Sequence, residues 1–144
     1  MYDRFLQLRV IYRDPPDLMQ LEVLVQYEGW AARSTVYASP HGFANDCERL
    51  SRWTKSLSEP LIIEAGADTG IGWLKLDFYT VDRVGHVACA VNLATGNQPT
   101  EARPAQTRRM AIEIPTEPAL IEQFARACIS LGKQLDGQAK LIGV

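Results

Sequence analysis

The sequence predicts an α+β fold, in which two helices pack on one face of a mainly antiparallel sheet of about six to seven strands. The clearest pattern in the sequence predicts a hairpin. Apolar and polar residues alternate along 73–79 and again along 87–93, on either side of the turn Asp82-Arg83-Val84-Gly85. The apolar spacing changes to three or four residues along 43–57 and 118–135, which is typical of amphipathic helices. Because helices do not alternate with single strands, a parallel sheet of β-α-β units is disfavoured.

Three strands are expected before the first helix, over 5–12, 21–27 and 30–38. Turn signals separate them: Asp14-Pro15-Pro16-Asp17 ends the first strand, and Glu28-Gly29 ends the second. Because neighbouring strands in sequence tend to pair, the three predict a meander.

The first helix is expected over 43–57, and it must stop before Pro60. A short strand at 61–65 and a glycine-containing loop at 66–72 then lead into the hairpin. The apolar stripe of this helix consists of Phe43, Cys47, Leu50, Trp53 and Leu57.

The last part of the chain is expected to form an exposed loop at 97–106, a strand at 109–114 and a closing helix. Thr116 is the expected N-cap of this helix, and its apolar stripe extends to Leu135. The expected order is therefore three strands, a helix, about four strands and a helix. The tail, 138–144, is expected to fray.

The composition indicates one soluble domain spanning residues 1–144. Hydrophobic residues make up 47% of the chain and charged residues 22%, and the formal net charge is −2. This charge gives no global positive field that would attract nucleic acid. The chain shows no secretion signal at its start and no run long enough for a membrane-spanning helix. We therefore expect a cytoplasmic protein whose partner is neither nucleic acid nor a membrane.

No segment carries a recognisable reaction centre, cofactor site or metal site. Cys47, Cys89 and Cys128 are widely spaced at apolar positions, which predicts free, buried thiols. His86 lies three residues from Cys89, but positions three apart on a strand point to opposite faces, so the two cannot act together. The chain has two histidines and no ligand cluster around either. The loop at 66–72 lacks the ending of a phosphate-binding loop. We therefore expect no catalytic residue, cofactor or metal.

Two groups of residues are candidate surfaces for a protein partner. The first is the polar side of the hairpin, because exposed Trp and Tyr beside charges are enriched in recognition surfaces; it comprises Trp73, Lys75, Asp77, Tyr79 and His86. The alternative is that these residues simply cover the second face of the sheet. The second, weaker group is Arg103, Arg108 and Arg109, and its alternative is a solvated loop and strand edge.

The element order resembles that of the WapI-type immunity proteins. The resemblance covers most of the chain: the early strands, the helix containing Phe43-Ala44-Asn45-Asp46-Cys47, the hairpin through Gly85-His86-Val87 and the closing helix. It implies a small cytoplasmic bacterial protein that binds and neutralises a cognate contact-dependent toxin. The sequence departs from the family pattern at Trp30-Ala31-Ala32, where Asn-Trp-Leu is expected, and at Thr116-Glu117, where Asp-Gln is expected.

The sequence therefore favours a non-catalytic module that binds another protein, and the resemblance implies a toxin domain as that protein. A competing interpretation is a small enzyme or small-molecule-binding protein that uses a cleft between the sheet and the helices, with His41, His86 and nearby acids. A third is a homodimer formed by the pairing of edge strands.

Overall fold

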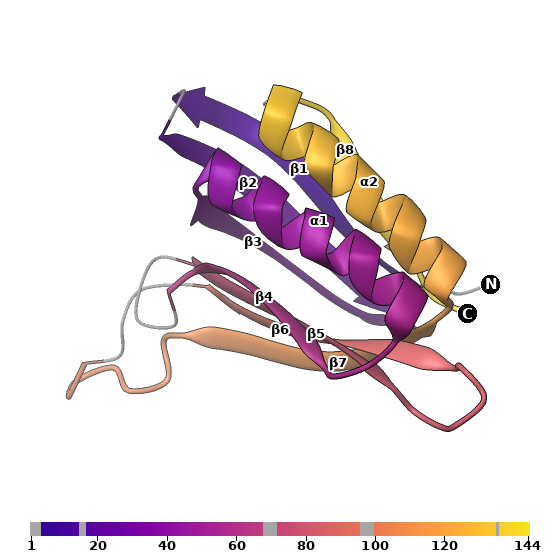
Figure 1. Cartoon of the computed structure of the whole chain (residues 1–144). Coiled ribbons are helices and arrows are strands. Elements are labelled where there is room, and N and C mark those ends of the chain that lie inside the picture. The colour runs from indigo at the N-terminus through magenta and orange to yellow at the C-terminus, as the bar shows by residue number, and fades with distance from the viewer. Residues whose placement is uncertain (1–3, 15–16, 68–71, 96–99, 135) are drawn as a thin grey trace.

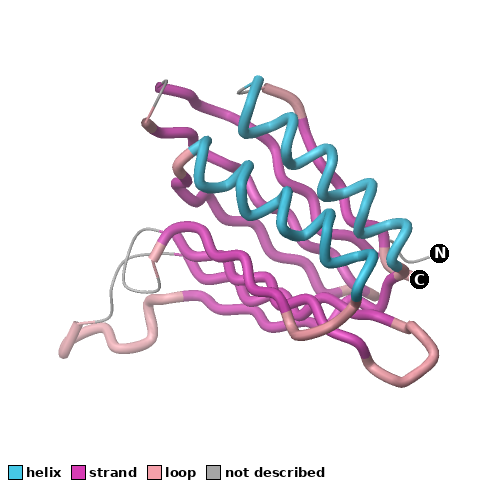
Figure 2. Tube along the Cα trace, viewed as in Figure 1, coloured by secondary structure: helices cyan, strands magenta, loops and turns pink. Residues whose placement is uncertain are grey.

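The structure, a computed structural model, describes residues 4–14, 17–67, 72–95, 100–134 and 136–144. Within these residues the chain forms eight strands and two helices. The strands make two separate antiparallel sheets of four strands each, and both helices lie side by side over one face of the first sheet (Figures 1 and 2).

The first sheet has the order β3-β2-β1-β8. Its strands are β1 (Arg4–Asp14), β2 (Leu18–Tyr27), β3 (Trp30–Ala38) and β8 (Gln138–Ile142). The three early strands form the meander that the sequence predicts, and β8 pairs antiparallel with β1 on the far side.

The second sheet has the order β4-β5-β6-β7, so each strand pairs with its neighbour in sequence. Its strands are β4 (Leu61–Gly66), β5 (Gly72–Thr80), β6 (Val87–Thr95) and β7 (Arg108–Thr116). The hairpin predicted from the alternating residues is confirmed as β5 and β6.

The expected single sheet of six to seven strands is wrong, although the α+β class is confirmed. The helix α1 (Pro40–Ser56) separates β3 from β4 in the chain. These two strands belong to different sheets, and each is an edge strand of its own sheet. The expected frayed tail is also wrong, because residues 138–142 form β8, whose Ala139 and Leu141 are buried. Of the expected loop at 97–106, residues 97–99 lie outside the described residues, and residues 100–106 belong to no helix or strand.

The helices begin and end where the local chemistry allows. In α1, the Ser39 side chain accepts a hydrogen bond from the backbone N–H of Gly42 at 3.4 Å, and Leu57 closes the helix in the left-handed region. The second helix, α2 (Pro118–Gln134), starts without the expected Thr116 cap. Thr116 belongs to β7, and its hydroxyl instead donates to the carbonyl of Ile142 at 2.8 Å.

The core lies between the helices and the inner faces of the two sheets. Helix α1 contributes Trp53, whose ring lies 6.3 Å from that of Phe78 on β5, so this helix packs against the second sheet as well as the first. The expected Leu135 at the end of the stripe on α2 lies outside the described residues. The buried residues of the two helical stripes are Phe43, Cys47, Leu50, Trp53, Ile121, Phe124, Cys128 and Leu131.

The edge strand β3 is where the two sheets meet. A Cβ at Gly72 would overlap the carbonyl oxygen of Thr35, and it would lie 3.2 Å from the Ser34 hydroxyl. The Ser34 side chain is buried and donates to the carbonyl of Ala94 at 3.2 Å. Only a glycine at position 72 leaves room for β3 to rest on β5, and Ser34 satisfies a backbone acceptor at the contact.

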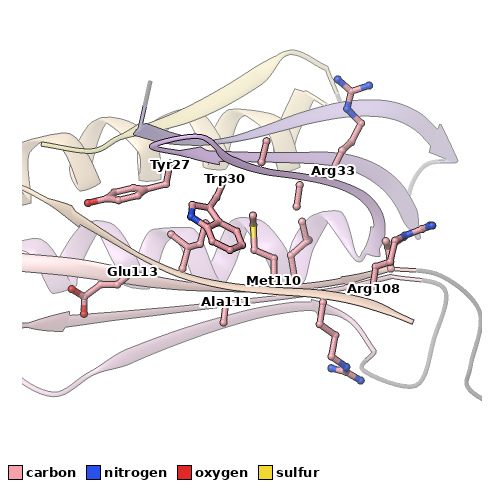
Figure 3. A pocket seen from close by; sticks show the side chains of 13 residues that line it. Tyr27, Trp30, Arg33, Arg108, Met110, Ala111 and Glu113 are labelled. Atoms are coloured by element: carbon pink, nitrogen blue, oxygen red, sulfur yellow. The ribbon is translucent and has the colours of Figure 1, made fainter. Parts of the chain in front are cut away.

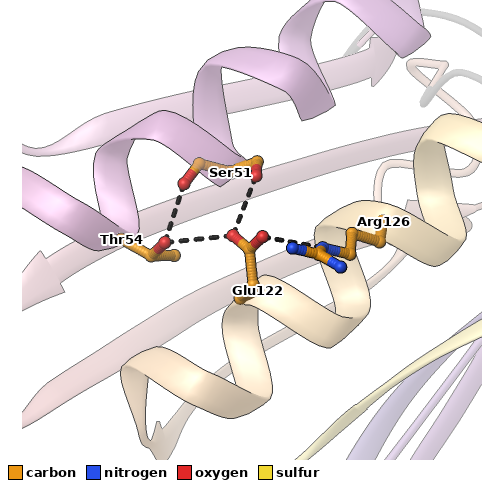
Figure 4. A network of polar contacts seen from close by, with 4 residues as sticks. All are labelled: Ser51, Thr54, Glu122 and Arg126. Carbon is orange, nitrogen blue, oxygen red and sulfur yellow. Dashed lines mark hydrogen bonds and ion pairs between the residues drawn. The ribbon is translucent and has the colours of Figure 1, made fainter.

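A polar network joins the exposed sides of the helices (Figure 4). The carboxylate of Glu122 on α2 accepts hydrogen bonds from Ser51 at 2.8 Å and Thr54 at 3.1 Å, both on α1, and from Arg126 at 2.8 Å. These bonds, led by that from Ser51, hold the pKa of Glu122 below its ordinary value.

The substitution Gly72→Ala should lower the free energy of unfolding by about 1–3 kcal/mol, because the added methyl group must push β3 away from the second sheet. Gly42→Ala is the matched control, since its Cβ would make only an ordinary contact with Ser39 at 3.6 Å. Urea unfolding of both variants measures the difference. Equal stabilities would contradict the tight contact at Gly72.

The substitution Glu122→Gln should destabilise the protein at neutral pH by about 1 kcal/mol, because hydrogen bonds to a charged group are stronger than neutral ones. The folded-state pKa is lowered, so this contribution is fully present above the ordinary glutamate pKa of about 4.3 and is lost as the pH falls through the lowered pKa. Urea unfolding at neutral and strongly acidic pH, with Glu117→Gln as control, tests this. A difference that persists in acid would contradict it.

Candidate functional site

The outer face of the second sheet is the principal candidate site. It faces away from the helices and the first sheet, and no described helix or strand covers it (Figure 1). The pairing register arranges its side chains in rows across β5, β6 and β7. One row is Trp73, Ala94 and Arg109; the next is Lys75, Asn92 and Ala111; the next is Asp77, Ala90 and Glu113; and the last is Tyr79, Ala88 and Pro115.

The two aromatic residues of this face are held by carboxylates from the outer strands. The Trp73 indole N–H donates to Glu64 of β4 at 2.5 Å, and the Tyr79 hydroxyl donates to Glu113 of β7. Ala94 and Ala88, which pair with these aromatic residues in the register, are buried. The central strand β6 thus presents small side chains between ordered aromatic and acidic ones.

Asp77 lies at the middle of the face with an unsatisfied atom. Its Oδ1 is buried and is the one buried side-chain oxygen or nitrogen among the described residues that has no hydrogen-bond partner. A buried acceptor without a donor costs about 1–3 kcal/mol. None of the ion pairs between described residues involves Asp77, Glu64 or Glu113. The outer face therefore carries three carboxylates that have no ion pair with any described cation.

The acids of the outer face change the ionisation of Tyr79. Burial first, and then the hydrogen bond to Glu113, raise the pKa of Tyr79 above its ordinary value, and the charge of Asp77 adds to the effect. Tyr79 is therefore a neutral donor, and the bond to Glu113 orients its ring.

Four of the five residues predicted for this surface do lie together, whereas His86 does not. Trp73, Lys75, Asp77 and Tyr79 alternate along β5 as expected. His86 precedes β6 and lies in the connection from β5, where its imidazole bonds to Asp82. That bond is the main cause that lowers the pKa of Asp82. The side chain of Asp82 also accepts from the backbone N–H of Val84 at 2.9 Å, so the pair stabilises a turn.

The three predicted arginines do not form one patch. Arg103 lies in the connection before β7, where its backbone bonds to that of Thr100. Arg108 and Arg109 are neighbours on β7, so their side chains point to opposite faces of the sheet. Arg109 belongs to the outer face, in the row of Trp73, and Arg108 belongs to the inner side.

A groove between the two sheets is a second candidate site, which the sequence did not reveal (Figure 3). It has a volume of about 710 Å³ and lies between the first half of β3 and β7, with Trp30 projecting into it. Its mainly apolar lining includes Tyr27, Trp30, Ala32, Leu93, Met110 and Ile112. The one hint of this groove in the sequence was Trp30, a large aromatic residue directly after the turn Glu28-Gly29. Only the arrangement of the two sheets shows that this side chain faces a groove.

The histidines and cysteines do not assemble into a reaction centre within the described residues. His41 and His86 line neither this groove nor the smaller cavity of about 210 Å³ between β3, α1 and β4. The three cysteines are free and buried, as predicted. Burial raises the pKa of Cys89, and burial together with the neighbouring Cys47 raises that of Cys128, so neither thiol is an activated nucleophile.

Two features are absent from the described residues. No group of three or more His, Cys, Asp or Glu residues is placed to hold a metal ion. No described helix combines the length and apolar character that crossing a membrane requires. Comparisons with models of protein families, with curated proteins and with solved structures found no match.

Tyr79 should remain un-ionised near pH 10, about the ordinary tyrosine pKa, while exposed tyrosines are half ionised. In Glu113→Gln its pKa should fall, because the acceptor loses its charge. The pH dependence of the assigned ring carbon signals of Tyr79 in NMR spectra measures this. Glu64→Gln is the control, since Glu64 bonds to Trp73. Equal effects of the two substitutions would contradict the assigned contact.

Proposed function

We propose that this protein is a non-catalytic binding protein that recognises another protein through the outer face of its second sheet. The observation that carries the proposal is the pair of ordered aromatic side chains, Trp73 held by Glu64 and Tyr79 held by Glu113, on a sheet face that no described helix or strand covers.

The composition of the outer face supports a protein partner. Trp and Tyr provide much of the binding energy in protein interfaces, and Trp73 and Tyr79 are already oriented by Glu64 and Glu113. An ordered aromatic side chain loses little conformational entropy on binding. On β6, Ala90 and Asn92 are the outer-face residues that remain partly exposed to a partner, since Ala88 and Ala94 are buried.

The charges favour a partner with a cationic surface. Glu64, Asp77 and Glu113 take part in no ion pair with a described residue, and the register places two cations, Lys75 and Arg109, on the same face as these three acids. Asp77 and Glu113 lie on either side of Ala90, so an arginine or lysine of the partner above Ala90 would reach both carboxylates. The resemblance to WapI-type immunity proteins makes a toxin domain the partner that we propose.

The enzyme interpretation has less support, because neither histidine lines either of the two cavities described above for the described residues. The test of the binding role is the affinity for the toxin domain encoded beside the gene of this protein. Asp77→Asn and Trp73→Ala should each weaken binding about tenfold or more, as central interface residues do. Calorimetric titration of the purified domain measures this affinity.

The matched control is Glu101→Gln, which removes one negative charge from an exposed position in the connection before β7. It should bind as the wild type does, and all variants should unfold at similar urea concentrations. Undiminished binding by Asp77→Asn and Trp73→Ala, or no binding by the wild type, would refute the proposal.

A further inference from the structure

The inter-sheet groove contains a large aromatic side chain that is mostly exposed. Trp30 is 71% exposed, whereas Trp53 in the core is 5% exposed. A tryptophan can bury 150–250 Å² on contact with a ligand, according to the usual range for aromatic residues, which is about the area that this side chain leaves open. Its position at the start of β3 directs the ring towards Met110 of β7 (Figure 3).

The remaining lining makes the groove suited to an apolar body. Met110 and Ile112 of β7 are only partly buried, although they lie on the inner side of the sheet with Leu93. The volume of about 710 Å³ falls within the range of typical small-molecule sites, roughly 300–1,000 Å³. The groove lies beside residues 30–33 of β3, directly before Ser34 and Thr35, where β3 contacts the second sheet.

The charged residues at the groove are unequally distributed. Arg33 of β3 and Arg108 of β7 lie at the same end, both are exposed, and neither takes part in an ion pair with a described residue. Glu113, the acid among the lining residues, lies at the other end and points to the outer face (Figure 3). An anionic group would therefore be stabilised beside Arg108.

We propose that this groove binds a small amphipathic anion. Its apolar body lies between Trp30 and the pair Met110 and Ile112, and its carboxylate or similar anionic group lies beside Arg108. The site differs from the proposed docking face in the residues that each test changes, although Arg109, Ala111 and Glu113 of β7 belong to the outer face and also line the groove. Each can therefore fail without the other.

The test uses decanoate as the probe and decyltrimethylammonium, which has the same chain and the opposite charge, as the control ligand. Isothermal titration below the micellar concentrations should show saturable binding of decanoate and at least tenfold weaker binding of the cation. NMR spectra should show the largest shifts at the Trp30 indole and the Met110 methyl group. Equal binding of both probes, or no binding of decanoate, would overturn the proposal.

Two variants locate the site, and each has a matched control. Arg108→Glu should weaken decanoate binding about tenfold, whereas Arg83→Glu, the same charge change in the exposed β5–β6 connection, should leave it unchanged. Trp30→Ala should weaken binding by a similar factor, whereas Val84→Ala, at a 78% exposed position, should not. Binding that is insensitive to both Arg108→Glu and Trp30→Ala would also overturn the proposal.

Discussion

The contact between β3 and the second sheet at Gly72 is the constraint on which the remaining architecture depends. A side chain at this position would overlap the backbone of Thr35, so the absence of one allows the edge strand of the first sheet to rest directly on β5. The hydroxyl of Ser34 bonds to the carbonyl of Ala94 at the same place. With the sheets joined there, α1 packs between them, and Trp53 contacts Phe78. The outer face of the second sheet is left uncovered, and the first half of β3 diverges from β7 to form the groove.

Local periodicity made much of the fold predictable. The hairpin and both helices follow from apolar spacing, because each element has one buried side that repeats at its own period. The division into two sheets could not be predicted in this way, since strand pairing depends on contacts between distant residues. The strand β8 was missed, although Ala139 and Leu141 alternate with polar residues, because five residues give a weak signal. Thr116 was misassigned as a helix cap. A threonine before Glu-Pro looks the same in the sequence whether its hydroxyl caps the following helix or donates to the carbonyl of Ile142 in β8.

The sequence predicted which residues of the candidate site share a face of one strand, but it did not predict their contacts with residues of neighbouring strands. Trp73, Lys75, Asp77 and Tyr79 share a face because strand geometry alternates strictly. Their partners Glu64 and Glu113 come from β4 and β7, and no sequence spacing connects these strands to β5. His86 was placed on this face by extending the alternation one step beyond the strand, where the turn with Asp82 interrupts it. The groove depends on the separation of two sheets, which the sequence does not encode in any local pattern.

The most direct test of this account is a nuclear Overhauser spectrum of the folded protein. The α protons of Gly72 should show strong contacts with Ser34 and Thr35, and β3 should show ladder contacts with β2 alone. A regular ladder of contacts between β3 and a strand of the second sheet would mean one continuous sheet. That result would contradict the two-sheet architecture, and with it both the uncovered face and the groove.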